Sequence, residues 1–131
     1  HGTEEGLWIE ETNEDIYWVE LRAVLQELNN KLKNTLILNM STCKGLHGMK
    51  IVDETAKEYP FFGLIGCYRD LYIPEAKLAN EMFYTKLLEA KDIKDIVPEI
   101  QAKFKDIGTT DEVIYSMSSQ SFKAIQKLGK R

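Results

Sequence analysis

The stretch that decides the fold is TLILNMSTCKG, residues 35–45, a near-continuous apolar run followed by a polar turn with one cysteine. An apolar run of this length is typical of a strand covered on both faces, as in α/β sheets. Cys43 therefore follows the carboxyl end of a predicted strand, at the sheet edge where α/β folds place their ligands. The run predicts a fold class and a candidate site together.

The remainder of the chain alternates short apolar runs with helical patterns, which favours an α/β layer structure. Strands are predicted at residues 7–10, 35–40, 61–66 and 113–118. Helices are predicted at 17–29, 52–59, from Pro74 onward, at 92–106 and at 122–128, with Pro60 ending the second and Pro98 marking a start or kink in the fourth. With no repeat or linker, residues 1–131 are predicted to form one domain around a thin sheet.

Composition excludes several function classes. The hydrophobic share of 44% and the charged share of 29% are ordinary for a globular protein, and the net charge is −4. Binding to nucleic acid or an anionic membrane needs a concentrated basic face, and the basic cluster Lys123, Lys127, Lys130 and Arg131 is interpreted as a solvated helix and tail. No apolar run approaches the ~20 residues of a membrane span. We therefore expect neither nucleic acid nor membrane as a partner.

The cysteines predict a reducing compartment. Cys43 and Cys67 both end apolar runs and are interpreted as reduced thiols in a cytoplasmic protein. Cys67 is predicted to be a core thiol. His47 lies four residues after Cys43, but two ligands do not make a zinc site, so neither a metal nor a cofactor is predicted.

A histidine upstream of Cys43 completes a candidate catalytic pair. His1-Gly2 opens the chain, 42 residues before Cys43 (43 − 1 = 42). A thiol becomes a nucleophile when it is deprotonated, and a nearby imidazole takes the proton or pairs with the thiolate. Glycine beside each catalytic residue lets the backbone approach a substrate closely, and backbone N–H groups there stabilise an oxyanion. His1-Gly2 and Cys43-Lys44-Gly45 supply these parts.

The order of these motifs resembles the peptidase family that includes the caspases. That family carries a strand ending in His-Gly, a helix, and a strand ending in an Ala-Cys-Arg-Gly type motif, whose place LNMSTCKG (38–45) takes here. The separation is close to the ~50 residues of caspases. The segment between the motifs and FFGLIGCYRDLYIPEAKLANEMFYTKLLEA (61–90) are most similar to the CHAT branch of the clan. The resemblance covers residues 1–100.

This resemblance implies a fold and an activity. The fold would be a caspase-like three-layer α/β sandwich with a mostly parallel sheet, lacking its first strand or strands. The activity would be that of a cysteine endopeptidase acting through a thioester, without a metal. Cys43 would be the nucleophile and His1 the base or ion-pair partner, and the N–H groups of Gly2 and Cys43 would form the oxyanion hole.

The resemblance also implies three substrate-binding residues. Ser41, two residues before the nucleophile, takes the place of a specificity residue. Caspases have Gln there and several relatives have Asp, so a neutral serine predicts no preference for the residue before the scissile bond. Arg69 and Asp70 follow the apolar run at 61–66 and would line the substrate groove.

Partners and alternatives follow from where the chain departs from the family. At least one strand precedes the catalytic histidine in the family, so we expect a missing N-terminal segment or a regulatory domain as a partner, besides a peptide or protein substrate. The oligomeric state is not predicted. Two other classes stay open: the same fold used as an inactive interaction module, and an unrelated flavodoxin-like binding domain. For Cys43 the simplest alternative is a buried structural thiol.

Overall fold

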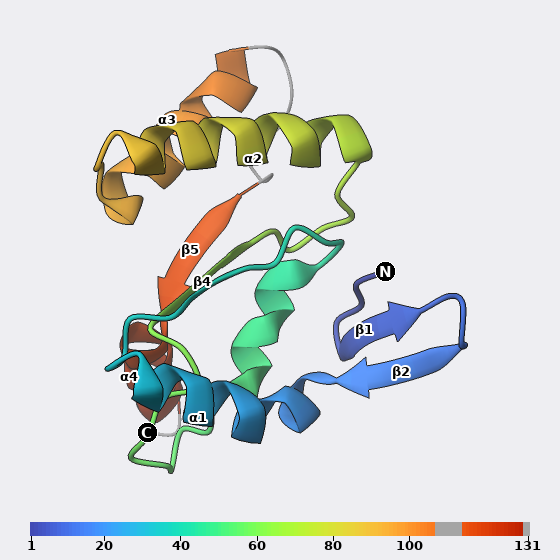
Figure 1. The fold of residues 1–131 in the computed structure, drawn as a ribbon, viewed down its shortest axis with the longest axis vertical. Coiled ribbons are helices and arrows are strands. Elements are labelled where there is room, and N and C mark those ends of the chain that lie inside the picture. Colours follow the sequence, from blue (N-terminus) through green and yellow to red (C-terminus); the bar gives the residue numbers. More distant parts are fainter. Residues whose placement is uncertain (107–113, 130–131) are drawn as a thin grey trace.

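The computed structural model describes residues 1–106 and 114–129 as a mixed α/β fold with two small sheets (Figure 1). The strands are β1 (Gly6–Ile9), β2 (Glu14–Tyr17), β3 (Ile37–Asn39), β4 (Gly63–Gly66) and β5 (Tyr115–Ser118). The helices are the 3-10 segments η1 (Trp18–Leu21) and η2 (Gly45–Ile51), and α1 (Arg22–Lys31), α2 (Ile73–Leu88), α3 (Ile93–Asp106) and α4 (Ser119–Gly129). The α/β class predicted from the apolar runs is confirmed.

The central sheet has the order β3-β4-β5 and is mixed. β3 and β4 are parallel, which the long connection between them allows, whereas β4 and β5 are antiparallel. The prediction of a mostly parallel sheet therefore holds for one of its two strand pairs. Strands β1 and β2 form a separate antiparallel hairpin. Of the strand predicted at 113–118, Val113 lies outside the described residues and β5 begins at Tyr115.

Each face of the central sheet packs against its own cluster of apolar side chains. The register places Leu38, Leu64 and Met117 in one row, and this row belongs to the cluster around Trp18, Leu46, Met49, Ile51 and Phe61 from η1, η2 and the segment before β4. Ile65 faces the other way, toward the cluster made by Ala79, Phe83, Ile96, Ile100 and Phe104 of α2 and α3. Helices thus lie on both faces, which explains why the central strand β4 is apolar and buried at every position.

The helices predicted from long periodic patterns agree with the structure. α2 begins at Ile73 with Pro74 in its first turn, where the missing proline N–H costs nothing. α3 begins at Ile93 and continues through Pro98. Its buried side chains follow helical spacing, so burial of one face outweighs the hydrogen bond that the proline removes.

The helix predicted at residues 52–59 is wrong. The helical residues lie earlier, in η2, which begins after Lys44 in a left-handed conformation (φ 54°) and ends at Ile51. From Ile51 onward, several backbone carbonyl oxygens accept hydrogen bonds from side chains that are distant in the sequence. The Arg22 guanidinium donates to the Ile51 oxygen, and the Lys123 ammonium donates to carbonyl oxygens within 52–59.

Lys123 corrects the interpretation of the basic C-terminal cluster. Its side chain is buried beneath the 52–59 segment, 7% exposed, with its ammonium 4.2 Å from the centre of the Tyr59 ring. Burial lowers the pKa of Lys123. Lys127 is exposed as expected, and Lys130 and Arg131 lie outside the described residues. Lys123 is therefore a structural cation rather than a solvated one.

The N-terminal hairpin was only half predicted. The strand expected at 7–10 corresponds to β1, whereas β2 has no counterpart among the predicted strands. β2 is polar and mostly exposed, so its pattern carries no strand signal, and its pairing with β1 defines it. The aromatic side chain of Trp18, directly after β2, is 1% exposed and belongs to a core cluster of apolar side chains.

Candidate functional site

The two cysteines lie at one edge of the central sheet. Cys67 follows β4 directly and Cys43 follows β3 after a three-residue turn; because the strands are parallel, both lie at the carboxyl edge. The two connecting segments are joined by backbone hydrogen bonds, from Lys44 N to Arg69 O (2.8 Å) and from Leu46 N to Cys67 O (2.9 Å). The location predicted for Cys43 is the one that the structure has.

The two thiols have different environments. Cys43 is half-buried, and its Sγ accepts a hydrogen bond from Leu71 N at 3.2 Å. Cys67 is fully buried, its Sγ donates to Arg69 O at 3.1 Å, and burial raises the pKa of its thiol. Both cysteines are free. Because nucleophilic thiols need access and a stabilised thiolate, Cys43 is the candidate nucleophile and Cys67 is confirmed as a core thiol.

The His1-Gly2 segment reaches the Cys43 loop through its glycine. A Cβ atom at Gly2 would overlap the Cys43 carbonyl oxygen and crowd Thr42 Oγ1, so the two backbones are in direct contact. Lys50, in η2, binds the residues between Gly2 and β1. Its ammonium donates to Glu4 O (2.9 Å) and pairs with the Glu5 carboxylate (3.0 Å). Only glycine allows this close approach.

The His1 side chain has other partners in this structure. Its Nε2 lies 3.2 Å from Glu10 Oε2, and its ring contacts the Trp8 ring in a tilted arrangement with centroids 5.1 Å apart. The terminal ammonium donates to Trp8 O at 2.9 Å. Within the described ranges no hydrogen bond joins the imidazole to the Cys43 sulfur. The structure thus brings the two backbone segments together while the side chains of the predicted dyad remain apart.

Arg69 and Asp70 leave the same edge. The guanidinium of Arg69 forms a two-pronged ion pair with the Glu75 carboxylate in the first turn of α2, at 3.1 and 2.7 Å. Both side chains of the pair are mostly buried, 27% and 14% exposed. The same guanidinium also donates to Asp70 O, and Asp70 itself is exposed. Arg69 therefore anchors the loop after β4 to α2.

This ion pair predicts how stability depends on pH. The hydrogen bond from Arg69 holds the pKa of Glu75 below its ordinary value. A lowered pKa contributes stability that is present above the unfolded value of about 4.3 and is lost as pH falls through the folded value. We expect Glu75→Gln to lower the free energy of unfolding by about 2 kcal/mol at pH 7, and by much less at pH 3. Urea unfolding at both pH values measures this difference; Glu81→Gln, exposed on the same helix, should show no such dependence.

Ser41 belongs to a cluster of neutral polar side chains that the sequence did not reveal. Asn39, the last residue of β3, donates from Nδ2 to Asn80 Oδ1 (2.9 Å) and to the Tyr84 hydroxyl (3.1 Å). Asn80 Nδ2 donates to Ser41 Oγ at 2.7 Å. Asn80 and Tyr84 lie one turn apart on α2, so spacing predicts that they share a helix face but not that this face meets the Cys43 loop.

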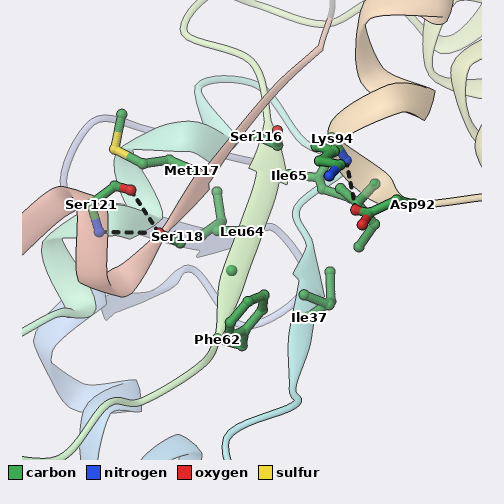
Figure 2. Close-up of a pocket in the computed structure, with 12 residues that line it drawn as sticks. Ile37, Phe62, Leu64, Ile65, Asp92, Lys94, Ser116, Met117, Ser118 and Ser121 are labelled. Carbon is green, nitrogen blue, oxygen red and sulfur yellow. Dashed lines mark hydrogen bonds between the residues drawn. The ribbon is translucent and has the colours of Figure 1, made fainter.

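Two grooves flank the central sheet. One, of about 530 Å³, lies over the face bearing Ile37, Gly63 and Ser118, with Asp92 and Lys94 at its rim (Figure 2). The other, of about 340 Å³, runs between η2 and α4 and includes His47. The His47 ring meets the Tyr68 ring edge-on, with centroids 5.8 Å apart. Both grooves are mostly apolar.

The described residues contain no group of three or more His, Cys, Asp or Glu side chains placed to hold a metal ion. None of the described helices combines the length and apolarity needed to cross a bilayer. Comparisons with protein-family models, with curated proteins and with solved structures give no match to this chain.

Proposed function

We propose that the chain is the catalytic part of a cysteine endopeptidase with Cys43 as nucleophile and His1 as its proton partner. One observation carries the proposal: the backbone of Gly2 packs directly against that of Cys43, although 40 residues separate them (43 − 2 − 1 = 40). This contact places a histidine directly before a glycine that touches the backbone of a half-buried cysteine, which supports pairing of the two side chains as base and nucleophile.

The chemistry proceeds in two steps. The Cys43 thiolate attacks the carbonyl carbon of the scissile peptide, and the N–H groups of Gly2 and Cys43 stabilise the oxyanion. The carbon–nitrogen bond breaks, the amine leaves with a proton from the His1 imidazolium, and a thioester remains on Cys43. Water then attacks the thioester while His1 takes its proton, and the product carboxylate and the thiol are released.

The His1 ring must turn for this chemistry. In the structure it is paired with the Glu10 carboxylate, and both side chains are largely exposed, 61% and 71%. Exposed ion pairs contribute 0–1 kcal/mol, so separation of this pair costs little. The movement that we propose carries the His1 ring away from Glu10 and from the Trp8 ring toward Cys43.

Thiol labelling tests the proposal. We expect the vinyl sulfone of acetyl-Ala-Ala-Ala, which a nucleophilic thiolate attacks at its double bond, to modify Cys43 and to leave the buried Cys67 unmodified, as read by peptide mass spectrometry. His1→Gln should slow the modification about 100-fold, the usual contribution of a positioned base.

The matched control is His47→Gln, which changes the other histidine of the chain and should leave the rate at Cys43 unchanged. Equal modification of both cysteines, or a rate at Cys43 that His1→Gln does not alter, would contradict the proposal. In that case Cys43 is a structural thiol.

The proposal includes the caspase-like sandwich of the CHAT branch, in the cytoplasm. Helices on both faces of the β3-β4-β5 sheet support it, as does the place of Cys43 after β3. β3 pairs with β4 alone among the described strands. Its second edge is therefore available to a strand from a preceding segment or from a regulatory domain.

A second candidate function is an inactive interaction module with the same fold. The open, mostly apolar groove in Figure 2 favours it, because Ile37 and Phe62 line it. The labelling experiment separates the two candidates: an interaction module has a Cys43 that reacts no faster than an ordinary exposed thiol and does not depend on His1.

A further inference from the structure

The cluster formed by Asn39, Ser41, Asn80 and Tyr84, here termed the amide cluster, lies beside the candidate nucleophile. Ser41 is two residues before Cys43, and a chain of two residues spans at most about 7 Å. Its hydroxyl is held from α2, 2.7 Å from Asn80 Nδ2, and it also lies 3.3 Å from Asn39 Oδ1. The amide cluster is thus fixed to the turn that carries the thiol.

The amide cluster has hydrogen-bonding capacity left over. The Tyr84 hydroxyl accepts from Asn39 at 3.1 Å, and half of the Tyr84 side chain is exposed. In the described part of the chain, its own proton and the second Nδ2 proton of Asn80 have no protein acceptor. Ser41 is exposed as well. A ligand at this surface therefore meets donors and acceptors together, and all four side chains are uncharged.

Two charged side chains near the Cys43 turn, Arg69 and Glu75, are paired with each other. Arg69, which a substrate carboxylate would need, is held by the Glu75 carboxylate at 2.7 Å. Glu75, which a substrate lysine or arginine would need, is held by the same contact. A charged substrate side chain that contacts the amide cluster exchanges water for neutral groups, which is costly, whereas a neutral polar group exchanges one set of hydrogen bonds for another.

We propose that the amide cluster selects peptides in which the residue before the scissile bond is glutamine or asparagine. A carboxamide side chain donates and accepts at once, which matches the spare Tyr84 and Asn80 protons and the Asn39 and Ser41 oxygens. This inference rests on the proposed peptidase function and adds its substrate class. It assigns Asn80 and Tyr84 of α2 as specificity residues.

A panel of four probes tests the inference. The vinyl sulfones carry acetyl-Ala-Ala followed by Gln, Asp, Arg or Ala, and the rate of Cys43 modification is measured for each. We expect the Gln probe to react about tenfold faster than the others, equivalent to about 1.4 kcal/mol from one or two hydrogen bonds. Faster reaction of the Asp or Arg probe, or equal rates for all four, would overturn the inference and leave the peptidase function standing.

Two variants sharpen the test. Tyr84→Phe removes one hydroxyl and should lower the ratio of the Gln-probe rate to the Ala-probe rate from about ten to about one. Asn80→Asp places a carboxylate in the cluster and should make the Arg probe the fastest; Asn30→Asp, exposed on α1, makes the same charge change elsewhere as the control. If Tyr84→Phe slows all probes equally, the residue is structural and the inference fails. Absence of Cys43 modification by every probe would overturn the peptidase function and this inference together.

Discussion

Replacement of Cys43 by alanine is expected to reduce peptide hydrolysis at least a thousandfold, to the background rate. The thioester of the proposed mechanism forms on this sulfur, and removal of a nucleophile abolishes the catalysis that depends on it (roughly 10⁶-fold in a well-studied serine protease). Hydrolysis of a denatured protein substrate, followed by the release of amino groups, measures the loss.

The same variant is expected to keep its fold. The Cys43 thiol is half-buried and accepts one hydrogen bond from Leu71 N, so its removal costs about 1 kcal/mol of unfolding free energy. Circular dichroism and urea unfolding verify this in parallel with the activity. Hydrolysis that survives in folded Cys43→Ala would refute the mechanism.

Replacement of Asn29 by aspartate is expected to lower the free energy of unfolding by about 4 kcal/mol, a large fraction of a domain's stability. Asn29 is 1% exposed and makes three hydrogen bonds. Its Nδ2 donates to Asn34 Oδ1 and Tyr59 O, both at 2.9 Å, and its Oδ1 accepts from Leu36 N at 3.0 Å. The introduced carboxylate still accepts from Leu36 N, but it has no N–H to donate to Asn34 Oδ1 or to Tyr59 O. The midpoint of urea unfolding at pH 7 measures the effect.

The pH dependence separates this cause from a general packing defect. Burial favours the neutral form of the introduced carboxyl, so its folded pKa lies above the unfolded value of about 3.9. The stability loss is therefore small near pH 3 and grows as the pH rises toward 7. Asn30→Asp, the same change at the exposed neighbour, should cost little at either pH. An Asn29→Asp loss independent of pH would show that shape rather than charge is responsible.

Part of the fold is predictable from local pattern. The apolar run before Cys43 predicts β3, and the periodic apolar residues after Pro74 and around Pro98 predict α2 and α3. Each of these elements buries one or both of its faces, so the spacing of its apolar residues along the chain indicates whether it is a helix or a strand. The predicted bounds of α3 differ from the observed ones by one residue at most, whereas α4 begins three residues before its predicted start.

The elements that were missed depend on distant partners. η2 was placed too late along the chain because its limits are set by the left-handed Lys44 and by the Arg22 side chain that bonds Ile51 O. Lys123 is polar by every local criterion and is buried because carbonyl oxygens of the 52–59 segment accept from its ammonium. Neither fact has a signal in the neighbouring residues.

The candidate site divides in the same way. The sequence predicts that Cys43 lies at a strand end and that Gly2 belongs to its surroundings, and the structure places the two backbones in contact. The pairing of the His1 ring with Glu10 and the share of α2 in the amide cluster were not foreseeable, because side-chain partners across 9 or 41 residues leave no trace in spacing.

The sequence by itself determined the α/β class, the periodic helices α2 and α3, and the position of one thiol at a sheet edge. These follow from hydrophobic burial, which acts residue by residue and leaves a period in the chain. Only the tertiary structure decided which backbone meets the thiol, which charges are already paired and which neutral amides surround Ser41. Those features depend on hydrogen bonds and ion pairs between distant segments, whose geometry is fixed after the core has formed.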